Sequence, residues 1–260
     1  MMRIVFTFLF MFVSALVAAA QSPAEVERGL LRHLKDVSKY GTYAGSYDDQ
    51  KSSAANRQVR NELLRNGNRP AILKYAFPKL KEEMFITTSN DGKLRIYSWD
   101  METGGTMHDY ASIFQYQGKS GKVYTWSETG DEESAGPFYT QIFQVPTKTN
   151  TIYLINSTFI ASSSLSGQSL DAVRILGEKL DRKARLIRTS SGLTHMVGFA
   201  YDFFSVVDHP ERPIRLFFFD EANREFRFPV VIEDDDVPQG RVTDKYIHYR
   251  FNGTHFVKVK

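Results

Sequence analysis

The sequence predicts a mainly β protein with antiparallel strands, preceded by one or two N-terminal helices. From Met84 onward, apolar and polar residues tend to alternate with a period of two, which is typical of half-buried strands. Most gaps between these runs carry turn residues, as at Asp91-Gly92 and Asn252-Gly253. The chain also contains 20 Phe and 13 Tyr, and aromatic side chains fit the pleated surface of a sheet.

The first 20 residues have the pattern of a signal peptide. Arg3 gives a positive start, and residues 4–17 form an apolar stretch that is too short to span a bilayer comfortably. Residues 18–20 are three alanines, which supply a small-residue cleavage motif. We expect cleavage before Gln21 and export to the periplasm or to the exterior of a bacterium.

The remaining chain divides by its periodicity into two parts. We expect residues 21–83 to form an N-terminal helical segment packed on an antiparallel β domain of residues 84–260. Ser22-Pro23 has the residues of a helix N-cap followed by proline at the first helical position, so a helix is expected over 22–39. A second helix is expected over 54–65, after the polar stretch 41–53.

The β domain is expected to consist of short strands joined by tight turns. The predicted strands cover residues 84–89, 93–99, 112–117, 122–127, 138–145, 151–162, 170–176, 184–188, 194–206, 214–219, 225–232, 242–251 and 254–259. The apolar spacing of 170–182 also fits a helix, but we favour a strand and hairpin there, with Gly177 in the turn.

Two strands echo one another in sequence. DGKLRIYSWD at 91–100 and SGKVYTWS at 120–127 both place Gly-Lys before a strand that ends in Tyr-x-Trp, 29 residues apart (122 − 93). Such an echo hints at repeated units, so we favour an antiparallel meander of propeller-like form. A β-sandwich and a barrel are the alternatives.

The last hairpin can be predicted in register. If Asn252-Gly253 is a two-residue turn, then Phe251 lies opposite Thr254. Tyr249 and Phe251 then share a face with Phe256, and we expect that aromatic face to be the buried one.

Composition excludes several classes of function. Removal of Arg3 with the signal peptide leaves 32 basic (33 − 1) and 30 acidic residues, a balance that gives no electrostatic basis for nucleic-acid binding. The chain has no cysteine, which excludes thiolate metal sites and Cys nucleophiles. The six histidines show no metal-ligand spacing, so no metal and no cofactor is expected. We also expect no membrane span after cleavage.

Three stretches look like parts of a known group. Residues 91–108 (DGKLRIYSWDMETGGTMH), 200–214 and 245–260 are similar to segments of exported bacterial β-rich proteins that carry no assigned function. The resemblance covers most of the mature chain, and it implies neither an activity nor catalytic residues.

Two motifs resemble catalytic signatures but lack the required context. The tripeptide 118–120, GKS, has Ile113 where a phosphate-binding loop needs Gly, and a strand is expected to follow it in place of a helix. Ser169 sits in a partial G-x-S-x-G pattern without its last Gly and in β surroundings. The acidic run 233–236 could offer oxygen ligands to Ca²⁺, but it lacks the spacing of an EF-hand loop, so we interpret it as a solvated turn.

Two loops are the candidate binding sites. The first is the glycine-paired loop after a predicted strand, with Trp99 at its root and Asp100, Thr103 and His108 as polar partners. Loops carried by a rigid β scaffold often hold binding sites, and Trp stacked on a sugar ring would suit such a loop. The second region covers 201–212 and contributes Asp202 and His209.

Three hypotheses for function follow, and the sequence leaves open whether the protein is an enzyme. The first is a non-enzymatic binding or interaction module for a small ligand, a glycan or a protein. The second is a glycan-directed hydrolase, which needs two carboxylates about 5–10 Å apart; the candidates are Asp100, Glu102, Asp202 and Asp208. The third is a structural envelope protein.

Overall fold

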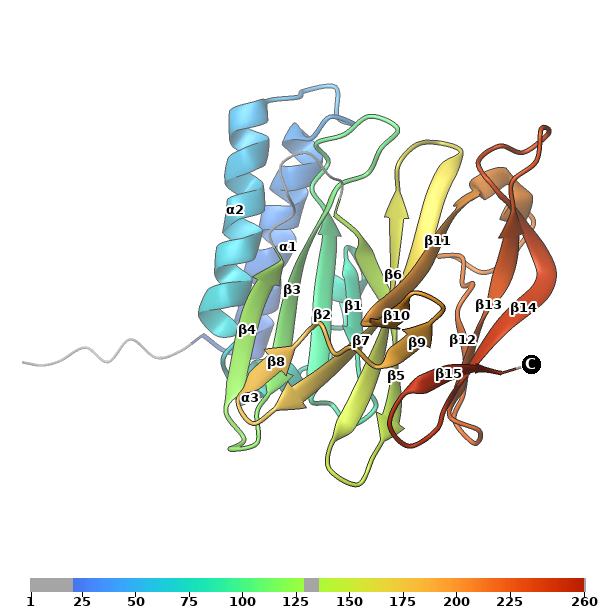
Figure 1. The fold of residues 1–260 in the computed structure, drawn as a ribbon. Coiled ribbons are helices and arrows are strands. Elements are labelled where there is room, and N and C mark those ends of the chain that lie inside the picture. Colours follow the sequence, from blue (N-terminus) through green and yellow to red (C-terminus); the bar gives the residue numbers. More distant parts are fainter. Residues whose placement is uncertain (1–20, 129–135, 260) are drawn as a thin grey trace, which may run out of the picture.

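The computed structural model describes residues 21–128 and 136–259 (Figure 1). The predicted signal peptide and its cleavage point before Gln21 lie outside or at the edge of this range. Among the described residues, no helix combines the length and the apolar character needed to cross a membrane.

The N-terminal part is helical. It contains α1 (Pro23–Tyr40), α2 (Asp49–Asn66), α3 (Pro70–Lys74) and the short 3₁₀ helix η1 (Leu80–Glu82). The predicted cap of α1 is confirmed, because Ser22 and Glu25 satisfy each other's backbone N–H groups in a capping box. Helix α2 begins earlier than predicted because the side chain of Asp48 accepts the N–H of Lys51 at 3.0 Å.

Three antiparallel sheets follow the helices. Sheet A contains β1 (Phe85–Thr88), β2 (Leu94–Asp100), β3 (Tyr110–Gln117) and β4 (Val123–Glu128), in that order. Sheet B has the order β11-β7-β6-β5 and contains β5 (Phe138–Pro146), β6 (Thr151–Ile160), β7 (Leu165–Leu176) and β11 (Met196–Asp202), with β8 (Lys179–Asp181) paired to β7.

Sheet C is built mainly from the C-terminal part of the chain. It has the order β10-β9-β15-β14-β13-β12 and contains β9 (Ile187–Thr189), β10 (Gly192–Thr194), β12 (Phe218–Asp220), β13 (Glu225–Ile232), β14 (Arg241–Phe251) and β15 (Phe256–Val259). The pairing of β15 with β9 is parallel, whereas the other pairings between these strands are antiparallel.

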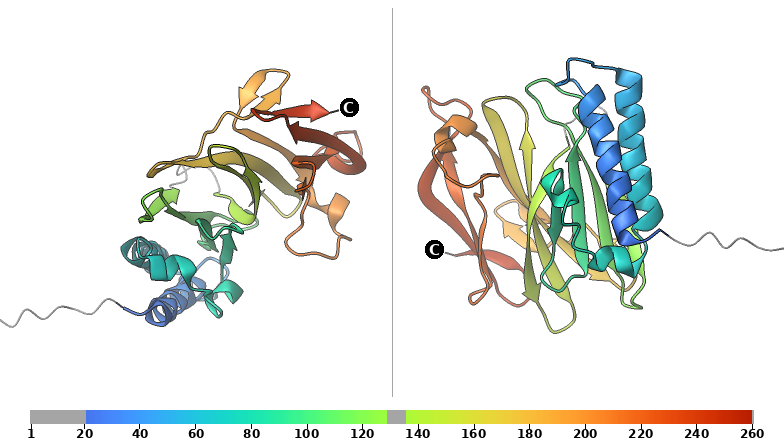
Figure 2. Two further views of the ribbon diagram at one scale, coloured as in Figure 1. Left: turned by 90° about the horizontal axis from the view of Figure 1, so that it is seen from below. Right: turned by 180° about the vertical axis from the view of Figure 1, so that it is seen from behind.

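The sheets stack in layers with sheet B in the middle, and α1 and α2 cover the outer face of sheet A (Figures 1 and 2). Strand β6 shows why sheet B takes the central place, because its side chains pack alternately into two cores. Tyr153 and Ile155 pack with sheet A, while Ile152 and Leu154 pack with the aromatic side chains of sheet C. A strand buried on both faces reads as a continuous apolar run, as the residues TIYLI do here.

The propeller-like arrangement is not found in the described residues, nor is a closed barrel. The two echoing segments become β2 and β4 of one sheet, separated by β3, so the echo does not mark successive blades. The coarser prediction of a mainly β protein with antiparallel strands and N-terminal helices is confirmed.

Of the predictions for individual strands and hairpins, some are confirmed and others are wrong. The strand and hairpin at 170–182 are confirmed, with Gly177 in the turn at φ +61°. The strand predicted over 194–206 is wrong in its last four residues, because the Asp202 carboxylate caps a 3₁₀ helix, η2 (Phe203–Val206). In the last hairpin Phe251 pairs with Phe256 and not with Thr254.

The side chain of Asn252 explains that last difference. Its Oδ1 accepts the N–H groups of Thr254 and His255 at 3.0 and 2.9 Å, which closes a four-residue loop in place of a two-residue turn. The register moves by two residues, so every side chain keeps its face. Tyr249, Phe251 and Phe256 are buried as predicted.

Candidate functional site

The loop between β2 and β3 is held by Asp100 at the end of β2. One carboxylate oxygen accepts the N–H of Glu102 at 2.8 Å, and the other lies 2.6 Å from Nδ1 of His108. Glu102 has a positive φ of +52°, which is uncommon for a residue other than glycine. Thr42 stabilises this conformation, since its N–H and O–H donate to the carbonyl of Glu102 at 2.8 and 3.0 Å.

His108 joins this loop to the end of β6 in sheet B. Its backbone N–H donates to the carbonyl of Ile160 at 3.1 Å, in an antiparallel bridge. The ring lies between Tyr43 and Tyr110, with centroids 5.4 and 6.3 Å away. Because Nδ1 faces Asp100, the free position of the ring is Nε2, which makes no hydrogen bond to the described residues.

His108 lines a cavity that we call the upper pocket, because the β2–β3 loop and the β6–β7 turn, which line it, lie at the upper end of the sheets in Figure 1. Its volume is about 340 Å³, within the range of small-molecule sites. The β2–β3 loop, the β6–β7 turn, the end of β11 and the segment after η2 all contribute to it. The lining residues are Thr106, His108, Phe138, Thr158, Ile160, Ser162, Ser163, Ser166, Tyr201, Phe203, Arg212, Pro213 and Ile214.

The upper pocket contains a hydroxyl that lacks a partner. Thr158 is only 5% exposed, and its Oγ1 makes no hydrogen bond among the described residues. Ser166, also buried, makes no side-chain hydrogen bond there either, whereas Ser157, the residue before Thr158, bonds to Ser169 at 2.8 Å. Buried polar groups in folded proteins are nearly always paired. Thr158 Oγ1 is one of seven buried side-chain atoms without a partner among the described residues, and of these it is the one that lines the upper pocket.

The side chain of Arg212 holds the loop that closes one side of the pocket. Its guanidinium donates to the backbone carbonyls of Val207 and Glu211 at 2.8 Å each, and also to that of His209. It lies over the ring of Phe203 at 5.9 Å from the ring centroid, at the outer limit of about 6 Å for a cation–π contact. These partners are neutral, so the positive charge of Arg212 is not neutralised by a carboxylate of the described residues.

The electrostatics of the pocket follow from its lining, which includes no Asp or Glu. Burial raises the pKa of Tyr201 to about 12, so its phenol stays neutral at physiological pH. Just outside the pocket, burial raises the pKa of Asp109, and the nearby carboxylate of Asp100 raises it further. No group of three or more His, Asp or Glu side chains in the described ranges is arranged to hold a metal ion.

Trp99 does not take the place expected of it. Only 1% of the residue is exposed, and it packs against α1 and α2 on the far side of sheet A from the pocket. Its indole N–H donates to Asn56 on α2 at 2.9 Å. Trp99 therefore presents no face for a sugar ring, because the helical segment covers it. Thr103 is exposed in the loop and does not line the pocket.

Asp202 and His209 lie beside the upper pocket without lining it. Asp202 Oδ1 accepts the N–H of Phe204 at 2.8 Å as the cap of η2. His209 is exposed, and its Nδ1 lies 3.3 Å from Glu211. The structure nonetheless brings the two candidate loops to one cavity, through His108 from the first and Phe203 and Arg212 from the second.

The sequence analysis did not identify the hydroxyl-bearing residues of the pocket, Thr158 and Ser166. Thr158 and Ser166 lie on β6 and β7, where alternation marks a residue as buried but does not show what it faces.

Comparison of the chain with protein-family models, with curated proteins and with solved structures finds no significant match in any of the three.

Proposed function

We propose that this chain is an exported, non-enzymatic binding module that holds one small amphipathic molecule in the upper pocket. The observation that carries the proposal is the upper pocket itself, which combines apolar walls with the cationic Arg212 and with the buried hydroxyl of Thr158, which lacks a partner among the described residues. Export rests on the signal-peptide pattern of residues 1–20, and the compartment is the periplasm or the exterior.

The walls of the pocket favour a ligand with an apolar body. Phe138, Ile160, Tyr201, Phe203 and Ile214 surround a volume sufficient for a small molecule. Burial of apolar surface contributes about 25 cal/mol per Å², so these walls supply much of the affinity.

The polar groups favour a ligand with a hydrogen-bonding, negatively charged end. Leaving a buried hydroxyl unpaired costs about 1–3 kcal/mol, and a ligand atom that bonds to Thr158 would remove that cost. Arg212 is cationic, and no lining side chain is acidic. An anionic head group is therefore favoured over a cationic one.

The hydrolase hypothesis finds less support. Of its candidate carboxylates, Asp100 bonds to His108, Glu102 accepts the hydroxyl of Ser38 at 2.9 Å, and none lines the upper pocket. Asp220 and Glu225 do face each other across β12 and β13 beside a small hollow.

That second pair of carboxylates lacks a candidate general acid. A hydrogen bond from Asn223 lowers the pKa of Asp220, and hydrogen bonds from His248 and Arg250 lower that of Glu225. A general acid in glycoside hydrolysis needs a raised pKa. The envelope-protein hypothesis calls for a surface without concave sites, whereas the described residues form a pocket.

A fluorescence titration tests the proposal. The probe is 8-anilinonaphthalene-1-sulfonate, which combines aromatic rings with one anionic group. We expect saturable one-site binding to the natively folded chain starting at Gln21. Phe203→Ala should weaken it about tenfold (~1.4 kcal/mol), because the variant removes an aromatic wall of the pocket.

The matched control is Phe204→Ala. Phe204 is the next residue, is 61% exposed and does not line the pocket, so its variant should bind the probe as the wild type does. Absence of saturable binding to the wild type, or equal weakening in both variants, would contradict the proposal.

A further inference from the structure

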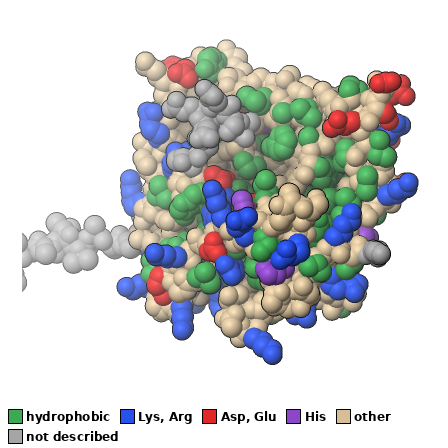
Figure 3. Space-filling model, in the orientation of Figure 1, with side chains coloured by type: hydrophobic (Ala, Val, Ile, Leu, Met, Phe, Trp, Pro, Cys, Tyr) green, Lys and Arg blue, Asp and Glu red, His purple; other side chains and the backbone are tan. Residues whose placement is uncertain are grey.

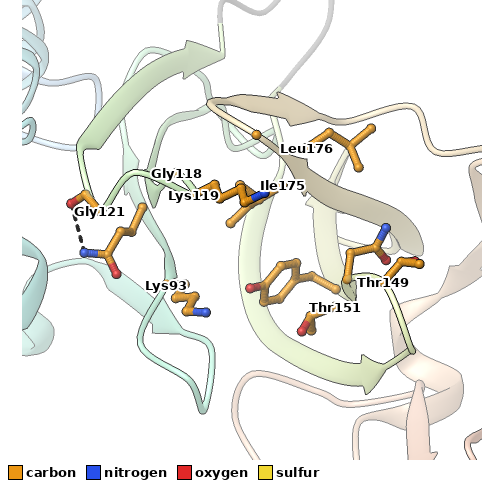
Figure 4. Close-up of a pocket in the computed structure, with 12 residues that line it drawn as sticks. Lys93, Gly118, Lys119, Gly121, Thr149, Thr151, Ile175 and Leu176 are labelled. Carbon is orange, nitrogen blue, oxygen red and sulfur yellow. Dashed lines mark hydrogen bonds between the residues drawn. The ribbon is translucent and has the colours of Figure 1, made fainter.

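A second hollow, the lower groove, lies at the opposite end of sheets A and B (Figure 4). Its volume is about 660 Å³, and it forms where the turns β1–β2, β3–β4, β5–β6 and β7–β8 come together. The lining residues are Lys93, Gln117, Gly118, Lys119, Gly121, Thr149, Asn150, Thr151, Tyr153, Ile175, Leu176 and Gly177.

Hydrogen bonds between the turns fix the shape of the groove. The N–H of Lys119 donates to the carbonyl of Gly177 at 2.8 Å, which joins the β3–β4 turn of sheet A to the β7–β8 turn of sheet B. The N–H of Asp91 donates to the side chain of Gln144 on β5 at 3.0 Å. The walls are thus formed before any ligand arrives, which lowers the entropic cost of binding.

Two lysines give the groove a positive charge. Lys93 and Lys119 are exposed, and neither forms an ion pair within the described ranges. No Asp or Glu is among the lining residues.

The carboxylates nearest to the groove are occupied by other donors. Asp91 accepts the hydroxyls of Ser89 at 2.7 Å and Tyr153 at 2.9 Å. Glu178 accepts the N–H of Ser120 at 2.8 Å and the hydroxyl of Tyr124 at 2.9 Å, and the first of these bonds lowers its pKa most. Asp91 also accepts the backbone N–H of Lys93 at 3.0 Å, and neither carboxylate forms an ion pair with the side chain of Lys93 or Lys119 in the described ranges.

Neutral hydrogen-bonding groups line the side of the lower groove opposite the lysines. Thr149 and Thr151 come from the β5–β6 turn, whereas Lys93 and Lys119 come from turns of sheet A (Figure 4). The side-chain oxygen of Asn150 accepts the hydroxyl of Thr147 at 3.3 Å, and its side-chain NH₂ group donates no hydrogen bond to the described residues. Such amides and hydroxyls match the hydroxyl groups of a sugar.

We propose that the lower groove binds an acidic oligosaccharide, with its carboxylates at Lys93 and Lys119 and its hydroxyls on the β5–β6 turn. The volume greatly exceeds that of a single phosphate or other small anion. A nucleic acid fits less well, because Tyr153 is the only aromatic residue of the lining and is 2% exposed, which leaves no ring for base stacking.

Isothermal titration calorimetry with tetragalacturonate tests this site on the folded chain starting at Gln21. We expect binding by the wild type, and at least tenfold weaker binding by the double variant Lys93→Gln/Lys119→Gln. The control is Lys35→Gln/Lys245→Gln, which makes the same change in net charge at exposed positions on α1 and β14 and should bind normally.

Two further ligands separate the alternatives. The fully methyl-esterified tetrasaccharide keeps the sugar skeleton without its charge and should bind at least tenfold more weakly. Inorganic phosphate alone should not compete at equal concentration. The proposal is overturned if the wild type does not bind tetragalacturonate, if both double variants lose affinity equally, if the ester binds as well as the acid, or if phosphate binds equally well.

Discussion

The two ends of sheet B carry different chemistry on the same strands. Strand β6 contributes Thr158 and Ile160 to the upper pocket and Thr151 and Tyr153 to the lower groove. With a rise of about 3.4 Å per residue, its ends lie roughly 30 Å apart. The upper end has mostly apolar walls with one arginine and an unpaired hydroxyl, whereas the lower end is mostly polar and bears two lysines without carboxylate partners.

The distribution of charged and hydrophobic side chains over the surface follows this contrast only in part. On the face shown in Figure 3, Lys and Arg side chains lie mostly at the left edge, across the middle and towards the lower edge, while hydrophobic side chains are spread over the upper part. Because the layered core fixes the fold, the loops at each end can carry separate binding sites. Ligands at the two ends should therefore respond to different substitutions.

The largest expected effect comes from filling the upper pocket. Ser166→Phe places a ring in the cavity, and we expect the affinity for 8-anilinonaphthalene-1-sulfonate to fall at least about thirty-fold (~2 kcal/mol). Tetragalacturonate binding should stay unchanged, because Ser166 lies at the other end of β7 from Ile175. If the variant still unfolds cooperatively but loses affinity for both ligands equally, the two binding sites are not independent.

A smaller effect on the free energy of unfolding should distinguish the unpaired hydroxyl of Thr158 from the paired hydroxyl of Ser157. Thr158→Val keeps the shape of the side chain and removes the unpartnered Oγ1, so the unliganded protein should gain about 1 kcal/mol in free energy of unfolding. Ser157→Ala, on the adjacent buried residue, breaks the hydrogen bond to Ser169 and should lose about 1 kcal/mol. Urea unfolding measures both; a loss for Thr158→Val would mean that its hydroxyl is satisfied in the free protein.

The smallest expected effect concerns pH at the upper end. Burial raises the pKa of Asp109 above its ordinary value of 3.8, so the folded state binds this proton more tightly than the unfolded chain does. The stability that the protonated form contributes is present below pH 3.8 and is lost as pH rises through the folded-state pKa. Asp109→Asn keeps an acceptor for the N–H of Gly136 and should unfold at a higher temperature at pH 7, with a smaller gain at pH 3.5.

The exposed Asp208→Asn in the segment after η2 is the control, and its melting temperature should not depend on pH in this way. A lower melting temperature for Asp109→Asn at pH 7 would contradict the burial argument.

Sequence alone predicted much of the fold because the signals were local. The turn at Gly177, the cap at Ser22 and the buried face of Tyr249, Phe251 and Phe256 all depend on neighbours in the chain or on alternation along one strand. The stacking of three sheets could not be predicted, because it depends on which faces meet. An echo between β2 and β4 carries no such information.

The candidate site was predicted as two loops and found as one cavity. His108 and the segment containing Arg212 were visible as polar loops, but their approach depends on the bridge from His108 to Ile160. Trp99 was misplaced for the opposite reason. A tryptophan at the root of a loop looks available in sequence, whereas here α2 covers it and Asn56 bonds its indole.

The most direct test of the account is a ¹H–¹⁵N correlation spectrum of the chain starting at Gln21, recorded with each ligand in turn. The account predicts that 8-anilinonaphthalene-1-sulfonate shifts the amide signals of 106–108, 158–166 and 201–214 and leaves those of 117–121 and 149–151 in place. Tetragalacturonate should give the reverse pattern. Shifts from 8-anilinonaphthalene-1-sulfonate that fall outside the upper pocket, or that spread evenly over the chain, would contradict the central claim that this pocket is a binding site.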